Sequence, residues 1–229
     1  NSFKNEDGSV NWLPVCADAH GFVVNRSLFE KYGIPLPTDY DSFVSACQAF
    51  EKHGIRGFDA DYFYDYTCME TLQGLSVSEL SSAEGRKWRT AYSDPADTAR
   101  VGLDDTVWPG AFARMEQFIR DTGLTAADLE LNYDDVTGMF GKGELAMYFS
   151  SSAGVQMFRE QGIDAIFLPF FSQNGEKWLM TTPYFQVALN RELTQDTERR
   201  KKALTVLDAM LSADSQSRII SDGQDLLSY

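Results

Sequence analysis

Apolar residues follow two different spacings along the chain, and the alternation of these spacings predicts strands interleaved with helices. Short apolar runs rich in β-branched and aromatic residues are typical of buried strands. Between these runs, apolar residues three and four positions apart are typical of amphipathic helices. This order favours a layered α/β fold. The expected strands are residues 22–24, 56–59, 145–150, 164–168, 177–181 and 185–190, the last two separated by Pro183.

The clearest unit covers residues 21–54, where a strand leads into two helices. Gly33 can end the first helix in a left-handed conformation, and the two prolines that follow prevent the helix from continuing. Thr38 and Asp41 have the spacing of a capping box for the second helix. We expect that helix to bury Phe43, Ala46, Cys47 and Phe50 and to stop at Gly54.

Further helices are expected along the rest of the chain. Residues 61–75 are an aromatic-rich candidate that ends at Gly74, and residues 82–92 are a more polar one. A third helix, closed by Gly123, is expected to bury Trp108, Phe112, Met115 and Ile119, which recur at spacings of four, three and four. The last long helix is expected to bury Ala203, Val206, Leu207, Met210 and Leu211.

The charge of the chain narrows the range of partners. Its 34 acidic and 20 basic residues give a formal net charge of -14, a surface that repels phosphate backbones and anionic membranes. Nucleic acid is therefore not an expected partner. No apolar run approaches the roughly 20 residues that span a bilayer. Residues 1–8 are polar and lack the features of a signal peptide, so the chain looks like part of a longer protein.

Cysteine and histidine offer little chemistry. Cys16, Cys47 and Cys68 are odd in number and lack the paired spacing of metal ligands. A buried inert thiol is expected for Cys47, and one disulfide with a leftover thiol remains an alternative. With only His20 and His53, a histidine-rich metal site is excluded, and neither a metal nor a cofactor is expected.

Three stretches resemble a known family. The first stretch combines apolar, Asn and basic residues at the end of the first strand, Gly and Pro-Thr in the turn, and acidic and aromatic residues in the next helix. It resembles a segment of carbohydrate-type solute-binding proteins of bacterial ABC importers, the maltose-binding-like group. Residues 140–147 resemble the phrase that precedes a core strand in that family, and the C-terminal DGQDLLSY resembles its exit from the last helix. The matching residues of the first stretch are Val24, Asn25, Arg26, Leu28, Phe29, Gly33, Pro37, Thr38, Asp41 and Phe43.

The resemblance implies a periplasmic-binding-protein-like (type II) architecture of two α/β lobes, with the N-terminal part of lobe one missing from this chain. Residues 1–18 would be a crossing segment with part of lobe one, residues 19–181 the second lobe, and residues 182–229 the return to lobe one. The implied function is extracellular capture of a carbohydrate or similar polar solute. Hinge closure would then deliver it to an ABC-importer permease without catalysis. A monomer is expected, lipid-anchored to the membrane in a Gram-positive organism or periplasmic in a Gram-negative one.

Candidate ligand-binding residues combine aromatic faces with hydrogen-bonding groups, as sugar recognition requires. Tyr62, Tyr64 and Asp65 lie in an aromatic cluster at the start of a predicted helix. In the resemblance, Asp18 falls where that family can place a ligand-binding carboxylate, and Tyr62 falls on a stacking aromatic. The alternatives are core packing for Tyr62 and a solvated loop position for Asp18.

The chain departs from the family after the strand at residues 145–150. The family often carries a stacking tryptophan there, whereas this chain has three serines followed by Ala153. Ser151 and neighbouring backbone donors could bind a polar group, with a simple helix cap as the alternative. Trp178 or Tyr184 could replace the missing ring, or the ligand is small, or it is not a sugar.

Two other classes of function stay open. The first is a secreted glycoside hydrolase, which would draw a carboxylate pair from Asp59, Asp61, Asp65, Asp104 and Asp105. The second is an adhesin or sensor module that binds a protein or peptide.

Overall fold

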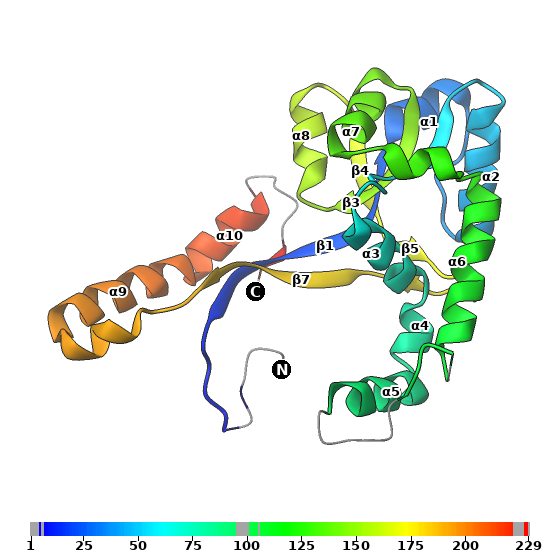
Figure 1. The fold of residues 1–229 in the computed structure, drawn as a ribbon. Coiled ribbons are helices and arrows are strands. Elements are labelled where there is room, and N and C mark those ends of the chain that lie inside the picture. Colours follow the sequence, from blue (N-terminus) through cyan, green and yellow to red (C-terminus); the bar gives the residue numbers. More distant parts are fainter. Residues whose placement is uncertain (1–4, 6, 95–100, 105, 222–226, 229) are drawn as a thin grey trace. The chain divides into compact units, whose positions relative to one another are not determined.

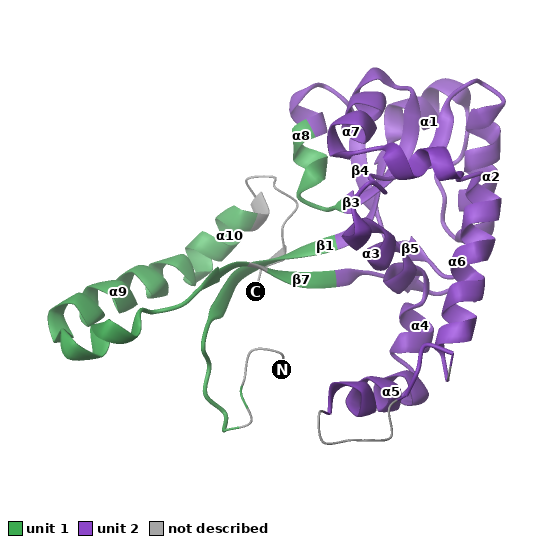
Figure 2. Cartoon of the chain, viewed as in Figure 1, with its two compact units in different colours: residues 1–19, 151–157, 181–229 green, residues 20–150, 158–180 purple. Residues whose placement is uncertain are grey.

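The computed structural model describes residues 5, 7–94, 101–104, 106–221 and 227–228, and for residues 184, 220, 221, 227 and 228 the backbone alone. The chain divides into two compact units (Figure 2). Unit 1 contains residues 1–19, 151–157 and 181–229, and unit 2 contains residues 20–150 and 158–180. The chain therefore passes between the units four times. The short piece at residues 151–157 was not separated in the three-part division expected from the sequence.

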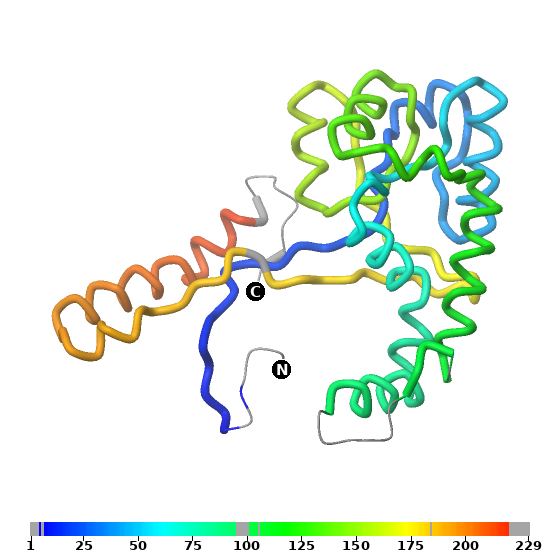
Figure 3. Tube along the Cα trace, viewed as in Figure 1, coloured from blue at the N-terminus to red at the C-terminus, as the bar shows by residue number. Residues whose placement is uncertain are grey.

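The described chain combines strands with helices, as the spacing of apolar residues predicts, and its longest run of consecutive helices extends from α3 to α7 (Figures 1 and 3). In chain order the elements are β1 (Leu13–Asn25), α1 (Arg26–Tyr32), α2 (Tyr40–Glu51), β2 (Arg56–Asp59), α3 (Asp65–Leu75), α4 (Val77–Leu80), α5 (Ala83–Ser93), α6 (Trp108–Thr122), η1 (Ala126–Glu130), α7 (Tyr133–Lys142), β3 (Leu145–Ser151), α8 (Gly154–Glu160), β4 (Ala165–Leu168), β5 (Phe170–Phe171), β6 (Lys177–Trp178), β7 (Met180–Val187), η2 (Arg191–Gln195), α9 (Thr197–Met210), α10 (Ala213–Ser221) and β8 (Leu227–Ser228).

The central sheet has the strand order β2-β3-β1-β4. β2 and β3 are parallel, with Phe58 opposite Met147 and Asp59 opposite Tyr148. β1 and β4 are antiparallel, with Phe22 opposite Leu168. The carboxyl ends of β2 and β3 therefore share one edge of the sheet, which is where open α/β sheets bind their ligands.

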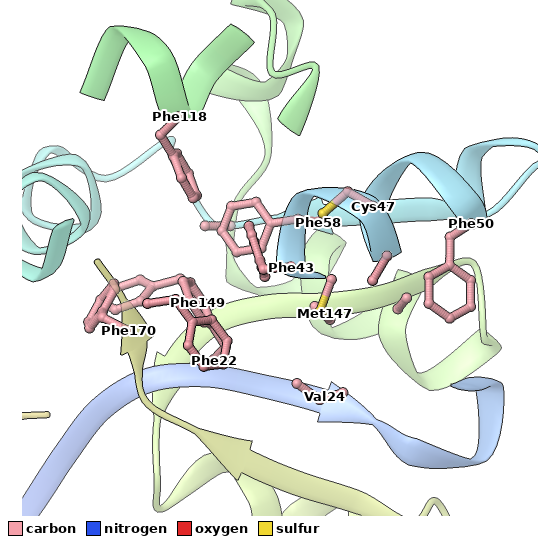
Figure 4. Close-up of a cluster of buried hydrophobic side chains, with 14 of the residues drawn as sticks. Phe22, Val24, Phe43, Cys47, Phe50, Phe58, Phe118, Met147, Phe149 and Phe170 are labelled. Carbon is pink, nitrogen blue, oxygen red and sulfur yellow. The ribbon is translucent and has the colours of Figure 1, made fainter. Parts of the chain in front are cut away.

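One face of this sheet is covered by a cluster of aromatic rings in unit 2 (Figure 4). Phe22 of β1 stacks on Phe43 of α2, with ring centroids 4.8 Å apart, and meets Phe58 of β2 edge-on at 5.5 Å. Phe118 of α6 meets Phe58 edge-on at 5.2 Å, and Phe170 of β5 closes the cluster 5.1 Å from Phe22. These rings join five elements that lie far apart in the sequence.

The opposite face of β3 is covered as well. Tyr148 contacts the rings of Phe140 on α7 and Phe158 on α8, with centroids 5.1 and 5.9 Å away, while its strand neighbours Met147 and Phe149 belong to the first cluster. A strand that is buried on both faces needs apolar residues at consecutive positions. This requirement explains the continuous run at the start of β3.

Several local predictions are confirmed. Gly33 ends α1 with φ 65°, and Gly123 ends α6 with φ 71°, both in the left-handed region. Beyond these predictions, Asn25 caps α1, because its side chain accepts a hydrogen bond from the backbone N–H of Leu28. The four residues expected on the buried face of α2 are all buried. Cys47 is among them, and the three cysteines of the chain form no disulfide.

Most of the predictions that the structure corrects concern where a helix begins or ends and which of its faces is buried. The capping box of α2 is formed by Asp39 and Ser42, one residue later than the predicted pair, because the Asp39 carboxylate accepts the Ser42 N–H at 2.8 Å while Ser42 Oγ accepts the Asp39 N–H. The helix expected from residue 61 begins at Asp65 and continues through Gly74. A Cβ at Gly74 would collide with the Phe170 ring, so this glycine serves close packing of α3 on β5 and does not end the helix.

The predicted buried face of α6 is wrong at two of its four positions. Phe118 and Ala111 are fully buried, whereas Phe112 is 40% exposed and Ile119 lies at the surface. The spacing of Ala111, Phe118 and Thr122 fits a helix as well as the larger apolar residues do, and the core selects the face that carries Phe118.

Unit 1 is the less buried part of the chain. β8 pairs with the start of β1 in antiparallel fashion, with Cys16 opposite Ser228, and the Gln216 side chain of α10 donates a hydrogen bond to the Val15 carbonyl at 2.8 Å. β7 runs through Pro183 without the expected break. The expected apolar face of α9 is not buried, since Val206 is exposed and Ala203, Leu207 and Met210 are half-buried.

The two faces of α6 provide a test of this core. Phe118→Ala should lower the free energy of unfolding by about 3–5 kcal/mol, because it opens a cavity within the ring cluster. Phe112→Ala, the matched change on the exposed face, should cost about 1 kcal/mol or less. Denaturant unfolding of both variants measures the difference, and equal losses would contradict the assigned face.

Candidate functional site

The loop that follows β2 lies at the carboxyl edge of the sheet and leads directly into α3. Two contacts fix its conformation. The Asp61 carboxylate accepts a hydrogen bond from Thr67 Oγ1 at 3.0 Å, and the Phe63 N–H donates to the Leu131 carbonyl at 3.0 Å. Burial raises the pKa of Asp61, with Glu70 contributing in the same direction and the Thr67 hydrogen bond opposing it. The loop therefore presents its aromatic residues from a fixed backbone.

Tyr62 points into the protein. Its side chain is only 6% exposed, belongs to the main apolar cluster and places its hydroxyl 3.5 Å from Thr71 Oγ1. The ring also forms part of the wall of a cavity of about 310 Å³, whose lining is mainly apolar and includes Met115 and Leu129. Core packing, the alternative considered for Tyr62, accounts for this position without a ligand.

The residues after Tyr62 form an exposed aromatic patch, defined here as Phe63, Tyr64 and Tyr66. The rings of Tyr64 and Tyr66 stack at 5.3 Å with an interplanar angle of 17°, and Phe63 meets Tyr64 edge-on at 5.3 Å. Phe63 is 58% exposed and Tyr66 is 57% exposed. Asp65 is exposed beside them, in the first turn of α3. The patch thus offers flat ring faces next to a carboxylate.

A polar pair links the exposed face of α3 to β1. Glu70, one helical turn after Tyr66, places its Oε2 3.1 Å from Nδ1 of His20, and both side chains are partly exposed. The His20 ring lies 6.2 Å from that of Phe149. The aromatic patch, the Glu70 carboxylate and the His20 imidazole therefore lie on or beside the exposed face of α3, all within unit 2.

Asp59, at the end of β2, is a buried structural acid. Its Oδ2 lies 3.3 Å from Nε of Arg56, its Oδ1 accepts the Ala60 N–H at 2.9 Å, and Arg56 also reaches Asp128 at 3.1 Å. Burial raises the pKa of Asp59 to about 7. The Ala60 N–H and Arg56 oppose this shift, and Asp128 adds to it. These contacts occupy Asp59 and remove it from the candidates for a glycosidase pair.

Asp18 and the serines after β3 lie together in unit 1. The Asp18 carboxylate accepts hydrogen bonds from Ser152 Oγ at 2.8 Å and from the Ala153 N–H at 3.4 Å, and it is almost fully buried. The Ala19 N–H donates to Ser152 Oγ in turn. Asp18 is therefore a buried residue and not a solvated loop residue. Its hydrogen bonds connect β1 to the segment that follows β3. Ser151 is half-buried beside this contact.

Of the two residues expected to replace the missing tryptophan, the structure describes the side chain of Trp178 alone. Trp178 of β6 is half-buried, lies opposite Phe170 and donates its indole N–H to Glu176 at 3.2 Å. The side chain of Tyr184 lies outside the described part of the structure. Asp105, one of the acids considered for a hydrolase, also lies outside the described residues.

The sequence prediction selects Tyr62, counts neither Tyr66 nor His20 among its candidates, and does not consider Glu70. The family resemblance places Tyr62 on a stacking aromatic, whereas the structure buries its ring in the core. Once α3 begins at Asp65, the spacing of Tyr66 and Glu70 marks the exposed face. A loop between the strand and the helix, with the helix starting only at Asp65, would have identified Tyr66 and Glu70 as neighbours on the exposed face.

The described residues hold neither a cluster of metal ligands nor a membrane-spanning helix. No group of His, Cys, Asp or Glu there is placed to hold a metal ion. None of the described helices combines the length and the apolar character required to cross a bilayer.

The raised pKa of Asp59 predicts a pH-dependent stability. The unfolded chain loses this proton near its usual pKa of 3.8, whereas the folded chain keeps it up to about pH 7. The folded state therefore binds more protons between these values, and the free energy of unfolding falls as pH rises from about 4 to 7, by up to about 4 kcal/mol.

Asp59→Asn should abolish this fall because the amide does not ionise. Denaturant unfolding of the wild type and the variant from pH 4 to pH 8 measures the effect, with Asp41→Asn as the control at an exposed aspartate. The same pH dependence in Asp59→Asn and in the wild type would show that another group carries the proton.

Solved structures share this fold. A probable secreted solute-binding lipoprotein from Streptomyces coelicolor is 18% identical, with a TM-score of 0.74 over 100% of this chain and 57% of that one. RafE in complex with raffinose, a protein whose apo-form is known from Streptococcus pneumoniae, is 18% identical, with a TM-score of 0.72 over 99% of this chain and 59% of that one. A sugar transporter of Bacillus licheniformis in complex with stachyose is 14% identical, with a TM-score of 0.65 over 93% and 55%.

These matches confirm the expected α/β, type II periplasmic-binding-protein-like fold. The chain spans 55–59% of the length of these relatives. No curated protein sequence matches the chain. The sequence does match a family model, that of the bacterial extracellular solute-binding proteins, over residues 2–217. The chain therefore belongs to the bacterial extracellular solute-binding protein family.

Proposed function

We propose that the protein captures a carbohydrate outside a bacterial cell and delivers it to the permease of an ABC importer, without covalent chemistry. The observation that carries this proposal is the exposed aromatic patch of Phe63, Tyr64 and Tyr66 beside Asp65. Relatives that share the fold are described as complexes with raffinose and with stachyose, which supports a sugar as the ligand class.

The chemistry of the patch suits a sugar. A pyranose ring has an apolar C–H face that packs on flat aromatic rings, and hydroxyls that need directional hydrogen bonds. Tyr64 and Tyr66 stack in parallel, so the outer face of the exposed Tyr66 ring is free for such packing. Asp65 and the Glu70–His20 pair would bind hydroxyls, and charge-assisted hydrogen bonds of this kind are about twice as strong as neutral ones.

The remaining candidates have secondary parts in this proposal. Tyr62 would support the loop from below, since its ring is buried. Asp18 would position the chain near Ser151 through its bonds to Ser152, and Trp178 and Tyr184 remain predicted ligand contacts.

The proposed organisation follows the two units. Unit 2 would be one lobe, close to the 19–181 region expected from the sequence, and unit 1 would hold the crossing segments and part of the other lobe. A lipid anchor and a monomeric state are part of the same proposal. The relative described as a secreted lipoprotein supports the anchor.

Thermal unfolding against a panel of sugars tests the ligand class. The protein expressed from its complete gene is heated with mono-, di- and oligosaccharides, including raffinose, stachyose and chitin oligosaccharides. Ligand at 100 times its dissociation constant should add about 2.7 kcal/mol of stability. A shift confined to related sugars, with the sugar recovered intact after overnight incubation, is expected. Cleavage of the sugar would favour a hydrolase, and no shift with any sugar would contradict carbohydrate capture.

Substitution of the exposed rings tests the site. Tyr66→Ala should weaken binding by about 1–3 kcal/mol because it removes an apolar stacking face, while Tyr66→Phe should retain most of the affinity. Calorimetric titration measures both. Leu129→Ala, at another exposed apolar position of unit 2, is the control and should bind normally. Unchanged affinity in a folded Tyr66→Ala protein would remove this patch from the site.

A further inference from the structure

The exposed face of α3 extends beyond the aromatic patch. Met69 and Glu70 come three and four positions after Tyr66, Gln73 comes four and three positions after them, and all four are exposed or partly exposed. From Tyr66 to Gln73 the helix rises about 10 Å, at about 1.5 Å per residue. The opposite face of α3 is buried against the core. This stripe therefore leads from the patch toward the far end of the helix.

A second aromatic site lies at that far end. Met69 and Gln73 of α3 form part of the lining of a cavity of about 530 Å³, together with Trp88, Arg89 and Tyr92 of α5 and Trp108 of α6. Figure 1 shows α3, α4 and α5 following one another along unit 2. The cavity lies entirely within this unit.

The ring geometry in this cavity repeats that of the patch. Trp88 and Tyr92 stack at 4.8 Å with an interplanar angle of 13°, and Trp108 meets Trp88 edge-on at 5.2 Å. Trp88 is buried and donates its indole N–H to the Gly102 carbonyl, so it is a fixed support, whereas Tyr92 is 67% exposed. One face of the Tyr92 ring is thus covered and the other is open.

The polar groups around these rings favour a sugar over an apolar ligand. The Gln73 amide and the Arg89 guanidinium are both exposed at the cavity, and they provide donors and an acceptor at different positions around the open ring face. The cavity beside Tyr62 differs in this respect, because its lining is mainly apolar. Of the two, the cavity at α5 combines stacking with hydrogen bonding.

We infer that the Trp88–Tyr92 cavity is a second sugar subsite, and that the ligand is an oligosaccharide long enough to lie along α3 from the aromatic patch to Tyr92. This inference rests on the proposed function and deepens it, because it assigns a minimum length to the ligand. The inner sugar units stack on Tyr66 and the outer units stack on Tyr92. Affinity therefore increases with chain length until the second subsite is filled.

Binding to two nested sugar series tests the inference. The protein from its complete gene is titrated calorimetrically with sucrose, raffinose and stachyose, and with chitin oligosaccharides of two to five units. The variants are Tyr92→Ala, Tyr92→Phe and, as a matched control on the same helix, Thr90→Ala, which does not line the cavity. Tyr92 is exposed, so its truncation is not expected to prevent folding.

In the series that binds, we expect the longest member to bind more tightly than the shortest. Tyr92→Ala should lower the affinity for the longest member about tenfold and leave the shortest unchanged, because loss of one stacking face is worth roughly one factor of ten. Tyr92→Phe and Thr90→Ala should behave like the wild type.

Sugar binding with the same length dependence in Tyr92→Ala and in the wild type would overturn the second subsite and leave the proposed function intact. An equal loss for short and long sugars would also overturn it, because it would place Tyr92 at the primary site. Failure of both series to bind would count against carbohydrate capture itself, and the inference would fall with it.

Discussion

The packing of phenylalanine rings on one face of the central sheet is the interaction on which the candidate site depends. Phe22, Phe43, Phe58 and Phe118 bring β1, α2, β2 and α6 together, and Phe170 extends the cluster to β5. The Phe170 ring also lies against Gly74, where any side chain would collide with it. The cluster therefore fixes both the end of β2 and the position of α3. These two elements in turn determine the position of the loop between them.

Much of this scaffold could be predicted from the sequence because its signals are local or periodic. The glycines in the left-handed region and the apolar face of α2 each depend on a few neighbouring residues. The errors arose where tertiary contacts decide. On α6, two faces fit helical spacing, and only the ring cluster selects Phe118 over Phe112. The role of Gly74 likewise depends on Phe170, which lies far away in the sequence.

The candidate site was predicted in composition more than in geometry. The aromatic and acidic residues after β2 stand out as ligand-like in the sequence, yet the choice of Tyr62 rests on the family resemblance, which does not give the direction of its ring. The direction of each ring in such a loop depends on where the helix starts, which Asp61 and Thr67 help to fix by a side-chain hydrogen bond. Periodicity cannot reveal that boundary. The pair of Asp18 and Ser152, separated by 134 positions, lay beyond any local signal.

The division of α3 into a buried and an exposed face has an evolutionary consequence. Its buried face, with Thr71, Leu72 and Gly74, is held by close packing and has little freedom to vary. Its exposed face, with Tyr66, Met69 and Gln73, contributes little to that packing. In the proposed function this face contacts the ligand, so substitutions there would change which sugar is bound while the stability of the fold is hardly altered. Selection for a different ligand would then act on one side of a single helix, without compensating changes in the core.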